Sequence, residues 1–290
     1  MSTINFSEKC SLLVCSCDKY SDAWVPYFEL LKKFWPEHPS KIYLNTETKS
    51  FECPDLDITI LNCEGEKTWS ERLYDSLSRI DTKYVLFTLE DFFLLDYVDQ
   101  TKLDECIELM EEDSSIALSR IYLSNEKLLK KQWKNTSMYI CEKHIKWRMD
   151  AQAAIWNREE LMNFLDMSES PWAFETQGTI RAKTWDKIIL WNYNEGKGNE
   201  NNFYPYEFLW DKGYGIAWGK WLWNNKEFFE KNGITGVNFD NLGMLSQKEA
   251  TRHNKYCTYM NTNVSITKKL YCVFYKITLI LKSIKEKISG

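Results

Sequence analysis

Short apolar runs alternate with longer segments of helical periodicity in the first third of the chain. Four apolar runs, each expected to form a buried strand, lie at residues 11–17, 41–45, 57–61 and 84–89. Helices are expected over 23–34 and from Thr68 or Ser70, the candidate N-caps, to Ile80. This order of elements implies a mostly parallel sheet with helices on its faces. Ligands of such sheets bind outside the carboxyl ends of the strands.

The middle of the chain continues this pattern less regularly. The further elements expected are a helix at 99–113, strands at 116–121, 138–141 and 151–156, and helices at 158–165 and from Ser170 onward. Residues 192–202 are polar and rich in Gly and Asn, so we expect a mobile lid there. The predicted fold class is α/β, a mostly parallel sheet flanked by helices, with a C-terminal amphipathic helix.

That C-terminal pattern begins near residue 264, where lysines flank an apolar stripe. The run is too short and too often interrupted by lysine to span a bilayer. A basic amphipathic helix can lie in the membrane interface and be attracted to anionic lipid. The alternative is a helix that docks on the protein's own core or on a second subunit. We therefore expect one domain at residues 1–263 and a helix at 264–290 that associates with the inner leaflet of a membrane or with a partner.

Composition narrows the possible functions. Hydrophobic residues make up 44% of the 290 and charged residues 27%, which suits a packed core. The net charge of -5 argues against a nucleic-acid partner. Aromatic residues reach 15%, and flat rings can stack on sugars or bases, although most must belong to the core. Six tryptophans in polar neighbourhoods are candidates for sugar contacts: Trp69, Trp172, Trp191, Trp218, Trp221 and Trp223.

The nine cysteines bear on the compartment. Their count is odd, their spacing is irregular, and we find no signal peptide, so reduced thiols in a cytoplasm are expected. No second cysteine pair completes a zinc pattern around Cys15 and Cys17, and the chain has three histidines. A structural zinc is therefore not expected.

Two adjacent carboxylates, Glu90 and Asp91, follow the most apolar of the expected strands. A strand end would hold them at the rim of a cleft, where a hard divalent cation bridging a diphosphate takes oxygen ligands. The alternatives are that one acid caps the next turn or binds a ribose, or that the pair is simply solvated.

Five short motifs of the chain are distinctive: Cys15–Tyr20, Trp69–Leu73, Tyr84–Leu94, Ser170–Glu175 and Gly213–Trp221. Together they resemble motifs of bacterial glycosyltransferases of the GT-A fold, of the capsule and lipopolysaccharide type. The resemblance implies that the domain at 1–263 binds a nucleotide sugar and catalyses its transfer. This chain has Glu-Asp-Phe where the family has a D-x-D motif, which leaves the dependence on metal open.

The resemblance also implies roles on the donor side. Glu90 and Asp91 would face the donor diphosphate, through Mg²⁺ or Mn²⁺ if a metal binds. Ser16 and Asp18 would approach the nucleotide. Arg72 would offer a charged fork to a phosphate or a carboxylate. Its alternative is a surface ion pair with a neighbouring acid such as Glu71 or Asp75.

On the acceptor side, Glu175 is the expected general base, with Asp150 in reserve. Inverting transfer needs a carboxylate that takes the proton of the attacking hydroxyl. Trp172, one helical turn earlier, would stack on the acceptor sugar, and Gln152 would be a second acceptor contact. Apolar neighbours would raise the pKa of Glu175. The alternative is that Glu175 only stabilises the start of its helix.

Other catalytic templates are missing from the sequence. It has no P-loop, no G-x-G-x-x-G and no G-x-S-x-G. We therefore expect a hexosyltransferase of surface polysaccharide synthesis, located in the cytoplasm and peripheral on the cytoplasmic face of a membrane. It would use a nucleotide-sugar donor, a UDP sugar in the first instance, and a glycan or lipid-linked glycan acceptor. The alternatives are a non-catalytic binding module on the same fold and a sugar nucleotidyltransferase.

Overall fold

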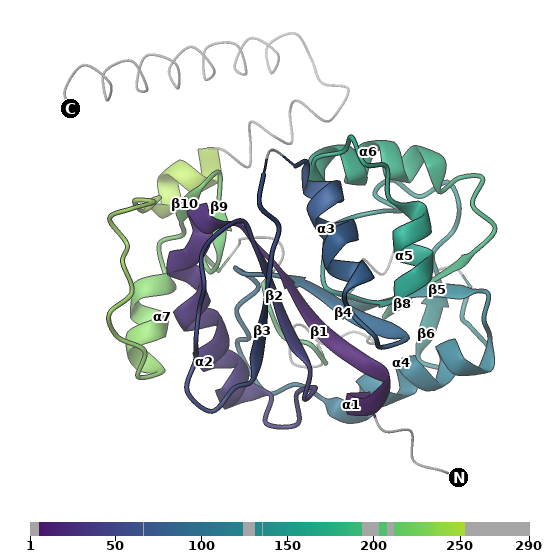
Figure 1. Cartoon of the computed structure of the whole chain (residues 1–290), viewed down its shortest axis with the longest axis horizontal. Coiled ribbons are helices and arrows are strands. Elements are labelled where there is room, and N and C mark those ends of the chain that lie inside the picture. Colours follow the sequence, from purple (N-terminus) through teal and green to yellow (C-terminus); the bar gives the residue numbers. More distant parts are fainter. Residues whose placement is uncertain are drawn as a thin grey trace, which may run out of the picture. The chain divides into compact units, whose positions relative to one another are not determined.

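The computed structural model describes residues 6–65, 67–123, 131–134, 136–192, 203–207 and 212–252 (Figure 1). The chain divides into two compact units. The first comprises residues 1–209 and 229–238, and the second 210–228 and 239–290. Among the described residues, the first unit holds an eight-stranded sheet of order β3-β2-β1-β4-β7-β5-β8-β6.

The first half of this sheet is parallel, as the sequence predicts. Its strands are β1 (Cys10–Cys15), β2 (Ile42–Thr46), β3 (Ile58–Asn62) and β4 (Tyr84–Leu89). β1 lies between β2 and β4, and its register aligns Cys15 with Leu89 of β4. Every residue of β1 is buried because both of its faces are covered. The carboxyl ends of these four strands therefore meet at one edge.

The second half of the sheet is mixed. Its strands are β5 (Ile116–Leu123), β6 (Met138–Ile140), β7 (Ala154–Asn157) and β8 (Ile188–Asn192). β5 and β8 are parallel, whereas β7 runs antiparallel to both β4 and β5, and β6 runs antiparallel to β8. The α/β expectation is confirmed, with an antiparallel strand in the middle of the sheet. Because β7 is reversed, the residues that precede it lie at the edge where β4 and β5 end.

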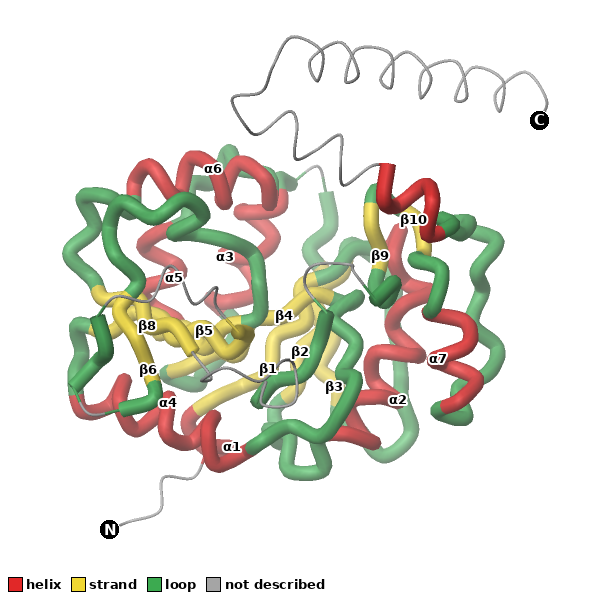
Figure 2. The backbone as a smooth tube through the Cα atoms, turned by 180° about the vertical axis from the view of Figure 1, so that it is seen from behind, coloured by secondary structure: helices red, strands yellow, loops and turns green. Residues whose placement is uncertain are grey.

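Helices cover both faces of the sheet. One face carries α3 (Trp69–Ser78), α5 (Arg158–Phe164) and α6 (Pro171–Arg181), whose apolar residues share a core with β1 and β4. Figure 2 shows α1 (Phe6–Lys9) and α4 (Gln100–Glu112) on the opposite face. A 3-10 turn (Asp18–Ala23) leads into α2 (Trp24–Phe34). The indole of Trp35, directly after α2, donates to Oε1 of Gln100 at 2.8 Å.

Short polar side chains begin these helices at the expected places. Thr68 caps α3 and forms a capping box with Glu71, while Ser70 is buried inside the helix. Ser170 caps α6, which has Pro171 at its first position. The local sequence therefore fixes where α6 starts, and with it the position of Glu175.

The second unit contains a small hairpin within the motif Gly213–Trp221. β9 (Ile216–Ala217) and β10 (Lys220–Trp221) pair antiparallel around Trp218 and Gly219, which both have positive φ. Helix α7 (Asn225–Lys231) includes the division between the units. The expected helix at 264–290 and the expected lid after Asn192 lie outside the described residues. No helix among the described residues is long and apolar enough to cross a membrane.

Candidate active site

Ser16 and Glu90 are neighbours at the carboxyl edge of the sheet. They directly follow β1 and β4, whose last residues are aligned in register. Ser16 is buried, and its Oγ accepts a hydrogen bond of 2.8 Å from the indole of Trp24. Sheet topology therefore brings together two of the predicted donor-binding residues, and Asp91 follows in the same turn.

Glu90 is a buried carboxyl group with a raised pKa. Removal from water raises its pKa well above the ordinary value, and the negative charge of Asp91 raises the pKa further. A hydrogen bond with Ser16 and the positive charge of Arg72 act in the opposite direction on this pKa. The side chain of Glu90 is 7% exposed, whereas Asp91 is partly exposed. The pair would be stabilised in its charged form by a cation.

Arg72 lies in the same place but has a different partner from those expected. Its Nη1 is 2.7 Å from Oε1 of Glu47 and 3.4 Å from the carbonyl oxygen of Ser16. Glu71 is engaged in the capping box and Asp75 contacts Arg79, so neither pairs with Arg72. Glu47 follows β2 directly and was missed, although an acid at a strand end was the available signal.

Asp18 organises the loop after β2. Its carboxylate accepts hydrogen bonds from the backbone N–H groups of Glu47, Thr48 and Lys49 and from the Thr48 hydroxyl. Burial acts to raise the pKa of Asp18, but these hydrogen bonds outweigh it and hold the pKa below its ordinary value. A nucleotide contact of Asp18 stays a prediction. The structure shows that Asp18 fixes the loop that carries Glu47.

Asp18→Ala should therefore destabilise the protein by about 2 kcal/mol at pH 7, the scale of a hydrogen-bonded charge. A lowered pKa means that this contribution is present above the unfolded-state value and is lost as the pH falls through the folded-state value. Urea unfolding at pH 7 and pH 3 measures the difference. An equal effect at both pH values would contradict the assigned role.

The expected base, Glu175, lies on α6 with its carboxylate partly buried. Its Oε1 accepts a hydrogen bond of 3.1 Å from the backbone N–H of Ala151. Burial raises the pKa of Glu175 to about 7. The Ala151 N–H and the charge of Arg120 lower this pKa, while the charge of Asp150 raises it. A carboxyl group that titrates near neutral pH is suited to accept a proton.

Asp150, the reserve base, is held in an ion pair. Its Oδ2 lies 3.0 Å from the guanidinium of Arg120 on β5 and accepts a 2.6 Å hydrogen bond from the hydroxyl of Tyr122. Its Oδ1 accepts a 3.3 Å bond from the backbone N–H of Gln152. Arg120 and Tyr122 were missed because they belong to an apolar strand pattern. Asp150 is committed to these partners, which leaves Glu175 as the better candidate.

A pair of stacked rings joins the two sides of the site. Phe92, next to Asp91, stacks on Tyr206 with ring centroids 4.5 Å apart and an interplanar angle of 21°. The Tyr206 hydroxyl donates to Oε1 of Gln152 at 3.0 Å and accepts from the N–H of Ala153 at 3.2 Å. Tyr206 was missed because its sequence neighbourhood carries no motif. The acid turn and the start of β7 are thus connected by direct contacts.

Few of the tryptophans considered for sugar binding are accessible. Trp172 is 75% exposed and Trp218 is 38% exposed, whereas Trp191 and Trp221 are buried. Trp172 stands in the first turn of α6, one helical turn before Glu175. Its exposed indole is available as a stacking surface near the candidate base.

A divalent cation fits the acid pair only together with a substrate. Among the described residues, no group of three or more His, Cys, Asp or Glu could hold a metal by itself. Mg²⁺ commonly binds through one or two carboxylates and the phosphates of a substrate. Glu90 and Asp91 provide two such carboxylates, and Arg72 lies close enough to lower the pKa of Glu90.

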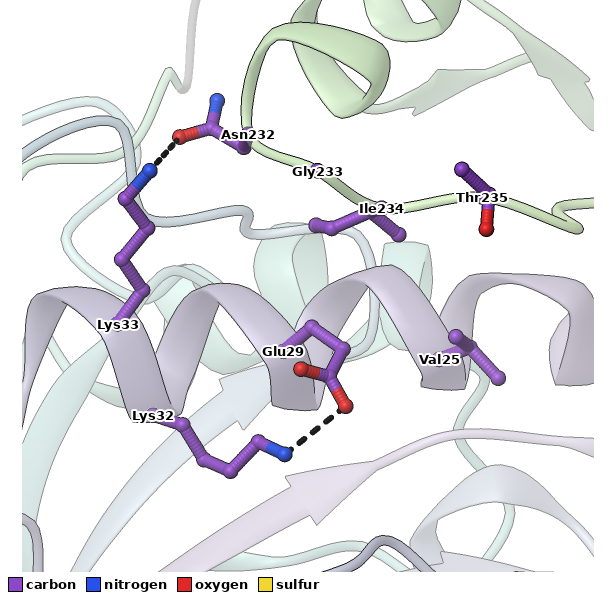
Figure 3. A pocket seen from close by; sticks show the side chains of 8 residues that line it. All are labelled: Val25, Glu29, Lys32, Lys33, Asn232, Gly233, Ile234 and Thr235. Atoms are coloured by element: carbon purple, nitrogen blue, oxygen red, sulfur yellow. Dashed lines mark hydrogen bonds and ion pairs between the residues drawn. The ribbon is translucent and has the colours of Figure 1, made fainter.

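A hollow of about 500 Å³ lies elsewhere in the first unit, between α2 and residues 232–235 (Figure 3). Lys32 pairs with Glu29 at 2.9 Å, and Lys33 donates to Oδ1 of Asn232 at 2.8 Å. The lining contains none of the predicted site residues. This hollow is therefore not part of the candidate site.

No protein-family model and no curated protein matches the chain. Among solved structures, it is similar to TarS 1-349 from S. aureus, with 11% identity, a TM-score of 0.46, and coverage of 91% of this chain and 69% of that one. It is also similar to Drosophila β1,4-galactosyltransferase 7 in complex with manganese, UDP-Gal and xylobiose, with 14% identity, a TM-score of 0.38 and coverage of 76% and 78%.

A cytidylyltransferase from Leptospira borgpetersenii is similar at 10% identity and a TM-score of 0.42, with 66% of this chain and 78% of that one covered. Likeness at these identities concerns the fold alone. The structural neighbours of the chain include GT-A-type glycosyltransferases.

Proposed function

We propose that the chain is a glycosyltransferase that moves a hexose-type sugar from a nucleotide-sugar donor to a hydroxyl group of a glycan. The observation that carries this proposal is the carboxyl group of Glu175, whose pKa is raised to about 7 beside the sheet edge that holds Glu90 and Asp91. A base and a phosphate-facing acid pair at one edge are the two halves that sugar transfer requires.

In the proposed reaction, the acceptor hydroxyl oxygen attacks the anomeric carbon while its proton passes to Glu175. A new carbon–oxygen bond forms as the bond to the donor phosphate breaks, and the nucleoside diphosphate leaves with that electron pair. Attack opposite the leaving group inverts the anomeric centre. Trp172 and Gln152 would orient the acceptor sugar.

Glu90 and Asp91 would hold Mg²⁺ or Mn²⁺ against the donor diphosphate. The ion would neutralise charge that develops on the leaving group. Arg72, beside Ser16, would contact the same phosphates. The fixed loop after β2 would then lie beside the nucleotide.

The acceptor proposed is a glycan or lipid-linked glycan of surface polysaccharide synthesis, and UDP is the first donor nucleotide to test.

The basic pattern at 264–290 supports attachment to the cytoplasmic face of a membrane. Removal of these residues should abolish co-sedimentation with anionic vesicles. Unchanged sedimentation would contradict membrane attachment without touching the transfer reaction.

Asp91→Asn should weaken binding of the cognate nucleoside diphosphate in the presence of Mn²⁺ by at least about tenfold, because one of the two cation ligands is lost. Calorimetric titration with UDP, GDP and dTDP, each with and without Mn²⁺, measures this affinity. Asp96→Asn is the matched control, because Asp96 is an exposed acid a few residues away. Equal affinities of Asp91→Asn and wild type would remove Asp91 from the donor site.

A further inference from the structure

The side chain of Arg120 binds the backbone and one carboxylate of residues 147–153, the segment that precedes β7. Nη2 of Arg120 donates to the carbonyl oxygens of Trp147 at 3.1 Å and Arg148 at 2.7 Å. The same group pairs with Asp150 at 3.0 Å. Arg120 therefore contacts three residues of the segment, and Trp147 at its start is held at a φ of 61°.

Helix α6 holds the same segment from the other side. The hydroxyl of Thr179 accepts a hydrogen bond from the N–H of Met149 at 3.0 Å and donates to its carbonyl oxygen at 3.2 Å. One turn earlier, Glu175 accepts from the N–H of Ala151. Arg120 and Glu175 do not share a hydrogen bond, but both bind the stretch of backbone between them.

Stability alone does not explain a guanidinium in this place. Arg120 is 2% exposed, and its Nε and Nη1 have no hydrogen-bond partner among the described residues. Its guanidinium carbon lies 4.9 Å from the centre of the Trp191 ring. Replacing a buried ion pair by apolar residues is often neutral or stabilising, so an arginine with unsatisfied N–H groups points to a role beyond stability.

The charges around Glu175 come from two elements. Asp150, in the segment, raises the pKa of Glu175, and Arg120, on β5, lowers it. The hydroxyl of Tyr122 donates to Asp150 and that of Tyr206 to Gln152, and burial raises the pKa of both phenols well above the ordinary value, so both are neutral. Removing Arg120 and removing Asp150 should therefore change the titration of Glu175 in opposite directions.

We propose that Arg120 is a positioning residue for the transfer reaction: by holding the 147–153 segment and the Asp150 carboxylate, it fixes the Ala151 N–H against the carboxylate of Glu175. The inference rests on the proposed function, because it assigns a purpose to the geometry around the base. Arg120 acts through Asp150 and the backbone and not by direct contact with a substrate.

The test compares Arg120→Met, Asp150→Asn and the double variant. In Arg120→Met, the acid limb of the kcat/KM profile should move to higher pH, with about a tenfold lower value at pH 6, because one pH unit is a factor of ten. In Asp150→Asn, the limb should move to lower pH. The double variant should lie between the two and stay folded, since both buried charges are gone.

The ¹³C resonance of the Glu175 carboxyl, identified by its absence in Glu175→Gln, reports the same order of pKa values without any substrate. Arg181→Met is the matched control. Arg181, the last residue of α6, pairs with the buried Glu169 at 2.9 Å between Nη2 and Oε2. This substitution should lower the stability of the protein and leave the acid limb of the kcat/KM profile in place.

The positioning role is wrong if the pKa of Glu175 moves in the same direction in Arg120→Met and Asp150→Asn, or if it moves in neither variant. If Glu175→Gln is inactive while these shifts are absent, the base assignment stands and only the role of Arg120 fails. An active Glu175→Gln would instead remove the base on which both proposals depend.

Discussion

Glu175→Gln is expected to lower the rate of sugar transfer by roughly 10³-fold, the middle of the range that general base catalysis contributes. Glutamine keeps the size of the side chain and can still accept the hydrogen bond from the Ala151 N–H. Donor affinity should stay unchanged, because Glu175 contacts none of Ser16, Arg72 or Glu90. Initial rates at saturating donor, together with calorimetric donor binding, check both statements.

The same substitution should make the protein more stable at alkaline pH. The pKa of Glu175 is raised from 4.5 to about 7 in the folded state, so the folded state binds the extra proton. Stability is therefore full below pH 4.5 and is lost as the pH rises through 7. Glu175→Gln avoids this loss, so its free energy of unfolding should exceed that of wild type by at most about 3 kcal/mol at pH 8.

Glu159→Gln is the control for Glu175, because its side chain is 79% exposed on α5. It should change neither the rate nor the pH dependence of stability. A Glu175→Gln variant that is slower in transfer but more stable than wild type is what we expect if Glu175 serves catalysis at a cost in stability. A Glu175→Gln variant that transfers sugar at the wild-type rate would remove this residue from the mechanism.

Phe92→Ala is expected to lower the free energy of unfolding by about 3 kcal/mol and to impair transfer in the protein that remains folded. Phe92 is 7% exposed and its ring stacks on Tyr206. Tyr206 holds Gln152 and the N–H of Ala153. Loss of the ring should therefore loosen the acceptor side as well as the acid turn. Urea unfolding and the KM for the acceptor measure the two effects.

Phe51→Ala is the control for the acceptor side, since the rings that Phe51 contacts, Phe28 at 5.4 Å and Trp24 at 5.8 Å, both belong to α2. It should cost stability and leave the acceptor KM unchanged. An equal kinetic effect of both substitutions would show that the Phe92–Tyr206 contact has no special part in the site.

Local signals predicted most of the first half of the fold. The strand at 84–89 and the cap at Thr68 were confirmed residue for residue. Apolar runs and capping residues act over a few positions, so they can be read without knowing the rest of the structure. They also place Glu90 and Glu175 correctly on a strand end and a helix.

Contacts between distant parts of the chain were not predictable in this way. The antiparallel direction of β7 depends on pairing with β4, about seventy positions earlier, and periodicity does not encode direction. That reversal is what brings Asp150 to the carboxyl edge. Arg120 lies inside a run that reads as an ordinary buried strand, and Glu47 is a single acid, so neither shows a pattern.

The type of group that the protein transfers is tested most directly by ³¹P NMR of the reaction products. A panel of UDP, GDP and dTDP sugars would be incubated with the protein, glycan acceptors and Mn²⁺, beside a panel of nucleoside triphosphates with sugar phosphates. A glycosyltransferase must release the nucleoside diphosphate from one sugar nucleotide, and Glu175→Gln must suppress that release. Pyrophosphate from the triphosphate panel, with no nucleoside diphosphate from the sugar nucleotides, would contradict the account and identify a nucleotidyltransferase.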